Sequence, residues 1–454
     1  MPWRVAGGIL VGLLALTVRV TPREEWLWLI GLTGLLTIGV FGWIKTSPAS
    51  LSIWEILTWA LVFRLTTLGV FPSWSDDVFR FYWDAWVAKL GGSPYAQTPR
   101  DGLPEMPPMA QAIFPQLNSP DYYSVYLPWH QTLFRLALGE GSNVHVFALK
   151  LQGIYTFIEL ICWGIILKLS TMDWISRWKW ILWNPILILE FIGNLHVEGL
   201  LVVFLVLSWT LYLSTSKMWI SIVPFVMAIA WKWTPLVWVP LLWVAFDRSN
   251  RWKALLFGVV SLPIFTWSLW PEVSRVGASL DLYFQRFEFN ASVYYLFRDM
   301  GIWILGYNPI QILGPWLSGL TVFGILYWAW RHPGNGRVRA YYSYTLYLAL
   351  ATTVHPWYAL PWMVVSVLSG RSAGWVGVWF MSWSYHAYSH PEQPIWAYAC
   401  LGCWILGEEI IFWRTPKLPA KHGLNYLHKF FQYLSPSNLA EVKRQSNSDN
   451  PIHL

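Results

Sequence analysis

Charged residues are scarce in this chain of 454 residues. Asp, Glu, Lys and Arg together make up 12% of the sequence, about half of the share in ordinary soluble domains. No polar stretch is long enough to build a large soluble domain. Apolar runs long enough to cross a bilayer recur along nearly the whole length. The composition therefore indicates a polytopic membrane protein.

Cysteine is also rare, and glycine-rich phosphate loops are missing. Three cysteines give no disulfide framework. Cys400 and Cys403 lie within an apolar run, where small residues of a membrane helix explain them better than a redox or metal site. Without a nucleotide-binding loop, nothing points to a nucleotide-sugar donor or to an ATP-driven mechanism. We expect no required cofactor.

The sequence also has no motif of closely spaced metal-ligating residues, and we therefore expect no metal site. Carboxylates and imidazoles that come together in the fold could still bind a divalent ion. That alternative stays open for Asp76, Asp77, His196, Glu198 and His355.

The basic residues are grouped in short loops, and the net charge is +7. This distribution is typical of cytoplasmic loops of a membrane protein and not of a nucleic-acid-binding face. We therefore expect membrane lipids and no nucleic acid among the partners. The groups are Arg248, Arg251 and Lys253; Arg331, Arg337 and Arg339; and Arg414, Lys417 and Lys421.

The apolar segments predict an all-α polytopic membrane protein of about 12–14 transmembrane helices. Residues 1–413 form one membrane domain, and 414–454 form a cytoplasmic C-terminal tail. Several segments are shorter than a full crossing, so a pair of them could be re-entrant. The segments are 5–20, 26–44, 51–71, 146–168, 178–192, 197–215, 218–231, 233–246, 253–270, 303–330, 340–354, 357–370, 373–388 and 395–413.

The first long loop, 72–145, is predicted to lie outside the cell and to carry interfacial helices, because it alternates aromatic-rich helical stretches with a Pro/Gly-rich segment. With the basic loops inside, the alternation of segments puts four other loops on that exterior side. The short loops indicate a bacterial plasma membrane. The four loops are 193–199, 271–302, 355–358 and 388–394, and the histidines gathered there are His130, His196, His355, His386 and His390.

Two adjacent carboxylates, Asp76 and Asp77, open the exterior loop. Aspartates in the first turn of a helix favour the positive end of its dipole, which would explain them structurally. Ionisable groups at a membrane boundary are more often functional. On a helix, Arg80 falls four residues from both Asp76 and Asp84 and can pair with either one. We therefore interpret the pair as functional, with Arg80 and Asp84 as supports.

Other polar residues interrupt apolar runs. His196 and Glu198 form either the polar tip of a hairpin or a second polar cluster. Lys232 needs a partner or a polar cavity unless it extends to the interface. Arg286, Arg298 and Asn290 stand among aromatics, in a headgroup- or sugar-binding loop or an ordinary aromatic belt. His355 is either functional or a helix-end residue.

The order of these motifs resembles the polyprenyl-phosphate-sugar-dependent glycosyltransferases of the GT-C superfamily, especially the bacterial mannosyltransferase-like members. The resemblance covers roughly residues 50–370. The motifs, in order, are SDDVFRFYWDAW, GGSPYAQTP, LNSPDYYSVYLPWHQ, WNPILILEFIGNLHVEGL, KWTPLVWVPLL, RFEFNASVYYLFR and HPWY.

The resemblance implies a multi-pass enzyme that transfers a hexose, mannose by this likeness, from a lipid phosphate to an acceptor hydroxyl of a lipid or glycan. Asp76 matches the catalytic aspartate of the family and Asp77 its neighbour. A carboxylate base suits this chemistry, and cations should lie beside the anionic leaving phosphate. The residues expected to bind the donor phosphate or sugar are Lys232, Arg286, Arg298, His355 and Tyr358; the acceptor cluster is His196, Glu198 and Asn290.

Two other functions stay open. The aspartates could serve a non-catalytic flippase or transporter of lipid-linked sugars as a proton or headgroup relay. Against this, no repeated halves occur, and the charges gather on one side. A ligase that moves a whole glycan from its carrier would use the same exterior residues.

Overall fold

The computed structural model of the chain describes residues 2–215, 218–245, 248–331, 336–390 and 395–414. The regular structure within these ranges is helical, and a single isolated β-bridge joins Phe289 to Thr353 there. The predicted all-α class is therefore confirmed. The predicted C-terminal tail lies outside the described residues, except for its first residue.

The helices of the first half run from the N-terminus to the middle of the bundle. They are α1 (Trp3–Val20), α2 (Trp26–Lys45), α3 (Ile53–Leu65), α4 (Asp77–Lys89), α5 (Pro99–Gly102), α6 (Pro108–Gln111), α7 (Pro128–Leu138), α8 (Val144–Leu169), α9 (Met172–Leu182), α10 (Pro185–Ile188) and α11 (Glu198–Thr215). Short turns lie between them: η1 (Leu103–Glu105), η2 (Phe114–Gln116) and the π-helical η3 (Leu189–Gly193).

The second half continues in the same way. Its helices are α12 (Met218–Trp231), α13 (Val239–Ala245), α14 (Arg248–Phe265), α15 (Val273–Arg286), α16 (Val293–Leu305), α17 (Ile310–Arg331), α18 (Gly336–Leu350), α19 (Leu360–Ser369), α20 (Ala373–Ser382) and α21 (Ile395–Arg414). The 3₁₀ turns are η4 (Thr234–Trp238), η5 (Trp267–Glu272), η6 (Pro356–Ala359) and η7 (Trp383–Tyr388).

Five helices in the described ranges are long and apolar enough to cross a membrane: α1, α2, α8, α11 and α17. A sixth span is possible if a helix pair bent by 69° between α14 and α15 is counted as one. The chain is thus a polytopic helical protein. The predicted segment 395–413 forms the 20-residue helix α21, and the remaining predicted segments form shorter or broken helices. The predicted segment 303–330 is split, because Gly306 ends α16 with φ of 77° before α17 begins.

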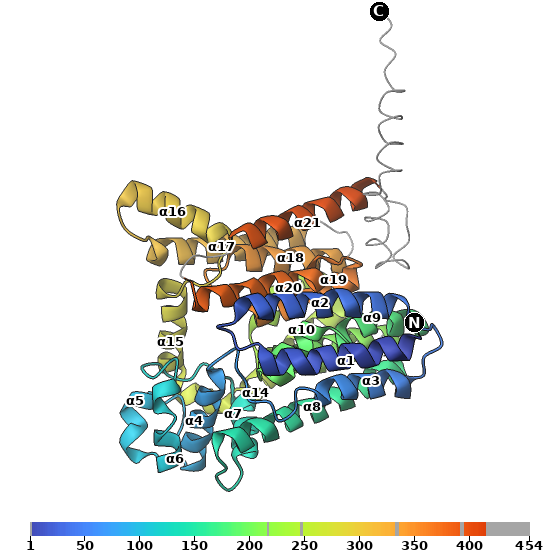
Figure 1. Cartoon of the computed structure of the whole chain (residues 1–454). Helices are drawn as coiled ribbons and strands as arrows, with labels where there is room; N and C mark the ends of the chain where they lie inside the picture. Colours follow the sequence, from blue (N-terminus) through green and yellow to red (C-terminus); the bar gives the residue numbers. More distant parts are fainter. Residues whose placement is uncertain (1, 216–217, 246–247, 332–335, 391–394, 415–454) are drawn as a thin grey trace, which may run out of the picture.

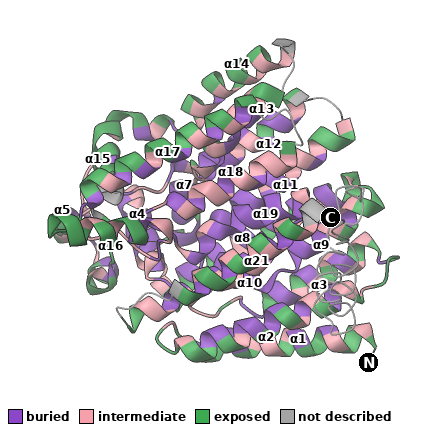
Figure 2. Cartoon of the chain, turned by 90° about the horizontal axis from the view of Figure 1, so that it is seen from above, coloured by how far each residue is buried: buried purple, intermediate pink, exposed green. Residues whose placement is uncertain are grey.

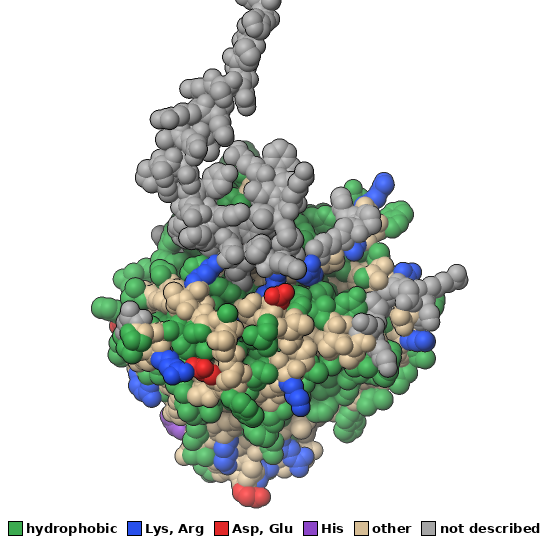
Figure 3. All heavy atoms as spheres, turned by 90° about the vertical axis from the view of Figure 1, so that its right-hand side faces the viewer, with side chains coloured by type: hydrophobic (Ala, Val, Ile, Leu, Met, Phe, Trp, Pro, Cys, Tyr) green, Lys and Arg blue, Asp and Glu red, His purple; other side chains and the backbone are tan. Residues whose placement is uncertain are grey.

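The long helices lie roughly side by side, and the helices of the 72–145 loop gather at one end (Figure 1). Buried residues concentrate in the middle of the bundle, along α8, α11 and α19 (Figure 2). The opposite end, which faces the viewer in Figure 3, is mostly hydrophobic and carries more Lys and Arg than Asp and Glu side chains. That end is the one that the sequence predicts to be cytoplasmic.

A pair of tryptophans joins α1 to α2 at that end of the bundle. The indole N–H of Trp3 donates to the backbone carbonyl of Trp43 at 2.9 Å, and the indole of Trp43 donates to the carbonyl of Trp3 at 3.0 Å. Their rings stack with centroids 4.6 Å apart. Both indole donors, of which Trp43 is buried and Trp3 half-buried, are therefore satisfied.

A fully buried ion pair joins α3 to α8. The Arg64 guanidinium donates to both carboxylate oxygens of Glu159 at 2.6 Å. It also donates to the carbonyls of Ala60 and Leu182, at 3.0 and 3.1 Å. The Leu182 carbonyl is freed where α9 ends, so the arginine satisfies a helix terminus as well as a charge.

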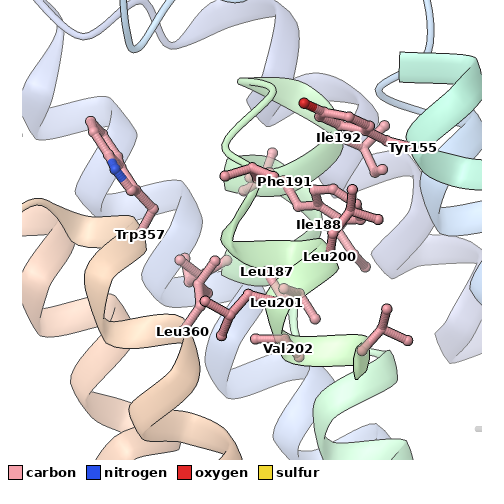
Figure 4. Close-up of a cluster of buried hydrophobic side chains, with 14 of the residues drawn as sticks. Tyr155, Leu187, Ile188, Phe191, Ile192, Leu200, Leu201, Val202, Trp357 and Leu360 are labelled. Atoms are coloured by element: carbon pink, nitrogen blue, oxygen red, sulfur yellow. The ribbon is translucent and has the colours of Figure 1, made fainter. Parts of the chain in front are cut away.

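A broken segment between α9 and α11 brings polar residues to the loop end. Asn184 caps α10, accepting a hydrogen bond from the amide of Leu187 at 3.0 Å, and α10 then passes into η3. Apolar side chains surround this segment (Figure 4), and Phe191 stacks on Tyr155. A Cβ at Gly199 would lie 2.0 Å from the Phe191 ring, so only glycine allows this close approach.

Candidate functional site

The loops that the sequence predicts to share one side of the membrane meet at one end of the bundle. We call the residues brought together there the loop-end cluster: Asp77 at the start of α4, His196 and Glu198 at the start of α11, Lys232 after α12, and His355 before η6. His196 is the centre, because its ring lies against Asp77, Glu190 and Trp357, which come from three different parts of the chain.

Asp77 is the carboxylate that faces the cluster. Its Oδ2 lies 4.0 Å from Nε2 of His196, its Oδ1 accepts a hydrogen bond of 2.8 Å from Asn118, and its side chain is 20% exposed. Burial raises the pKa of Asp77, and the carboxylates of Glu198 and Asp76 add to this, against the hydrogen bond from Asn118 and the charge of Lys232. A carboxylate with a raised pKa and solvent access is suited to accept a proton.

Asp76 points elsewhere. Its carboxylate pairs with the Arg23 guanidinium at 2.8 Å, and this guanidinium lies 4.5 Å above the centre of the Tyr388 ring. Burial opposes the charged form of Arg23, but the hydrogen bond and charge of Asp76 outweigh it and raise the pKa. Asp76 therefore serves an ion pair at the rim of the site.

The supports that the sequence assigns to the aspartate pair have another role. Arg80 pairs with Asp84 at 2.8 Å, not with Asp76, and also donates to the carbonyls of Ser119 and Tyr122, both at 2.9 Å. Both partners are almost completely buried. They hold the 118–124 segment of the 72–145 loop against α4, and Asn118 of that segment is the donor to Asp77.

His196 is held in place by a stacked ring and by a contact at one nitrogen. Its Nδ1 lies 2.9 Å from Oε2 of Glu190, and its ring stacks on Trp357 with centroids 3.5 Å apart. Its Nε2 is buried and has no hydrogen-bond partner among the described residues. A buried polar atom without a partner requires an explanation, and a bound group would supply one.

Glu198 and Lys232 form an ion pair beside His196. The Lys232 ammonium donates to the Glu198 carboxylate and lies 3.9 Å from the centre of the Tyr358 ring. The lysine side chain is 28% exposed, whereas the glutamate is buried. Lys232 thus has the partner that the sequence required, and one part of it still faces solvent.

His355 also stacks on Trp357. The two rings are 4.5 Å apart and nearly parallel, and Phe289 stacks on the imidazole at 4.8 Å. Burial, and then the charge of Lys232, lowers the pKa of His355 to about 3. The ring is therefore neutral at physiological pH.

The remaining predicted residues do not join the cluster. Arg298 pairs with Glu288 and Asp299, at 2.9 and 2.8 Å. Asn290, at φ of 49°, donates to the Val354 carbonyl at 2.9 Å and so anchors the strand-like segment before His355. The side chain of Arg286 lies outside the described residues.

Several residues of the site were missed from sequence: Arg23, Glu190, Trp357 and Tyr385. Glu190 gave a usable signal, because it is a lone carboxylate within the apolar run ILILEFIG. Arg23 gave a weaker signal, because a basic residue just after the first apolar segment is common at the end of a membrane helix. Aromatics such as Trp357 are lost among 36 tryptophans.

Within the described ranges, no group of three or more His, Cys, Asp or Glu side chains is placed to hold a metal ion. Comparison of the chain with protein-family models, curated proteins and solved structures finds no match. The chemistry of the loop-end cluster is therefore argued from its own geometry.

Proposed function

We propose that this protein is a membrane glycosyltransferase that moves a hexose from a polyprenyl phosphate to an acceptor hydroxyl at the exterior membrane face. The architecture would be that of the GT-C superfamily, with about 12–14 spans in a bacterial plasma membrane. Mannose is the sugar implied by the sequence resemblance, and the acceptor is a lipid or a glycan.

The observation that carries the proposal is the position of Asp77. It is a partly exposed carboxylate with a raised pKa, 4.0 Å from an imidazole nitrogen that has no hydrogen-bond partner among the described residues. Such a group suits the removal of a proton from an acceptor hydroxyl. We therefore assign the role of base to Asp77, and to Asp76 the role of holding Arg23.

The reaction is a single displacement. Asp77 takes the hydroxyl proton as the acceptor oxygen forms a bond to the anomeric carbon of the donor sugar. The bond from that carbon to the phosphate oxygen breaks, and its electron pair leaves with the lipid phosphate. Positive charge that develops on the sugar ring is stabilised by the carboxylate.

Two cations flank Asp77 and suit the lipid phosphate. Lys232 and Arg23 each pair with a carboxylate and each lie over a tyrosine ring. Each cation is already paired with a carboxylate. A bound phosphate would therefore interact with a cation that keeps its carboxylate partner. Lys232 is the nearer candidate, since its charge acts on Asp77.

The test is transfer of labelled mannose from polyprenyl-phosphate-mannose by purified protein in detergent, with lipid and glycan extracts as acceptors. We expect Asp77→Asn to lower the rate by about 10²–10⁴-fold, the usual contribution of a general base, while donor binding persists. Asp76→Asn is the matched control at the neighbouring carboxylate. Donor binding without product, together with movement of the lipid across reconstituted vesicles, would identify a flippase instead.

A further inference from the structure

We propose that Glu190 is a positioning residue that fixes the tautomer of His196, so that His196 receives the proton that Asp77 takes from the acceptor. The inference deepens the proposed function and rests on it. Glu190 lies beneath the loop-end cluster and does not reach Asp77.

Glu190 is a costly residue for its position. It is fully buried, and its carboxylate meets no Lys or Arg side chain in the described part of the chain. Its partners are the Tyr385 hydroxyl, which donates to both oxygens at 3.0 and 3.1 Å, and Nδ1 of His196 at 2.9 Å. A buried carboxylate supported only by neutral donors is destabilising, so its presence favours a function.

The backbone around Glu190 is unusual as well. Residues Leu189–Gly193 form a π-helical turn, and Leu195 has a φ of 63°, a conformation that leucine rarely adopts. The amide of His196 donates to the Glu190 carbonyl at 3.0 Å. π-turns and left-handed non-glycine residues gather at functional sites. Here they place His196 directly against Glu190.

A ring contact orients the imidazole, and a side-chain amide holds the segment that carries it. Trp357 stacks on its face at 3.5 Å and sets the plane of the ring. Asn194 donates to the Leu189 carbonyl at 3.0 Å and accepts from the amide of Trp74 at 2.9 Å. Trp74 lies three residues before the start of α4. The Asn194 side chain therefore connects the segment of His196 to the segment that carries Asp77.

The tautomer follows from these contacts. A carboxylate of Glu190 accepts, so Nδ1 of His196 carries the hydrogen and Nε2 keeps a lone pair. That nitrogen lies 4.0 Å from Oδ2 of Asp77. Burial, and then the charges of His355 and Lys232, lower the pKa of His196, so a proton that reaches Nε2 stays there only transiently. Glu198 acts on Glu190 from the same side.

The proton then has a defined path. After transfer, the O–H bond of protonated Asp77 breaks and an N–H bond forms at Nε2. The imidazolium that results is stabilised by the Glu190 carboxylate, and Asp77 is ionised while the product is still bound. The proton returns to Asp77 and leaves to water through its exposed edge when the product departs.

The experiment compares Glu190→Gln with the intact chain in two measurements. ¹⁵N NMR of histidine-labelled protein in detergent reports the tautomer, with the His196 signals assigned by their loss in His196→Phe. The rate of mannose transfer reports catalysis. We expect Glu190→Gln to mix the tautomers of His196, to lower kcat by about 10- to 100-fold, as loss of such a partner does elsewhere, and to leave the donor KM unchanged.

A matched control is Glu408→Gln. Glu408 is also a buried carboxylate, but it accepts from the Ser372 hydroxyl and from the Ser372 and Ala373 amides, at the start of α20. This variant should lose stability while kcat per folded molecule and the His196 signals stay unchanged. Tyr385→Phe should resemble Glu190→Gln more weakly.

Each outcome decides the matter. Unchanged His196 signals in Glu190→Gln, or kcat equal to that of the intact chain, would overturn the inference. Loss of folded protein with unchanged kcat per folded molecule would overturn it too, because a structural role predicts that result. If the intact chain transfers no sugar but Glu190→Gln still mixes the tautomers, the proposed function fails and the catalytic half of this inference fails with it, whereas the positioning of His196 stands.

Discussion

The Arg23 guanidinium lies 2.8 Å from the Asp76 carboxylate, one residue before the carboxylate that faces His196. The two neighbouring aspartates therefore have different roles. Asp76 is paired with a cation, whereas Asp77 is available to accept a proton. The predictions below test this separation, the charges around it, and the buried groups that hold the bundle.

Arg23→Gln and Asp76→Asn should have similar effects on mannose transfer, and the double variant should be no worse than either single variant. Both single changes break one ion pair, so their effects are not additive. We expect each to reduce kcat/KM by about tenfold or less, well below the effect of Asp77→Asn. Steady-state kinetics of the four proteins measure this. An additive double variant would show that Asp76 acts apart from Arg23.

The acid limb of the kcat/KM profile should lie above the ordinary aspartate pKa of 3.8, because burial and neighbouring carboxylates raise the pKa of Asp77. Activity falls as pH decreases through that pKa, since the protonated carboxyl accepts no proton. Lys232→Met removes a positive charge and should move the limb to higher pH. Glu198→Gln removes a negative charge and should move it to lower pH. Shifts in the same direction would refute the assignment of the limb to Asp77.

Arg64→Met should destabilise the protein by about 3–5 kcal/mol, because it leaves the buried Glu159 carboxylate without its partner. Replacing both residues by Met should cost less, since no charge is then left in the bundle. Unfolding in a denaturing detergent, followed by tryptophan fluorescence, gives the comparison. Equal losses in the single and double variants would mean that the carbonyl contacts of Arg64, and not the ion pair, are what matters.

Acid should destabilise the protein between about pH 6.5 and pH 3 through His130. This side chain is buried in α7 between Trp231 and Phe134, and burial, then the charge of Lys232, lowers its pKa to about 3. The unfolded chain binds more protons over that range, so stability rises with pH there. His130→Phe should flatten the dependence of the apparent Tm on pH. His390→Phe, at an exposed histidine, is the control and should leave the slope unchanged.

Sequence patterns predicted the helical class, because the lengths of apolar runs report on helices that can cross a membrane. They also grouped on one side the loops whose residues meet in the loop-end cluster. They did not predict which partner each charge selects. Arg80 lies four residues from both Asp76 and Asp84 in the sequence. Its pairing with Asp84 depends on the position of the 118–124 segment, which the sequence does not reveal. Glu190 was passed over inside an apolar run, since its partners His196 and Tyr385 come from a strained turn and from a residue 195 positions away.

The ion pair between Arg64 and Glu159 also constrains the order of biosynthesis. The two residues are 95 positions apart, and a ribosome adds about 5–20 residues per second. Helix α3 is therefore synthesised several seconds before its counter-charge. During that interval the arginine must be held by water, headgroups or the insertion machinery, so α3 can settle in its final position only when α8 arrives.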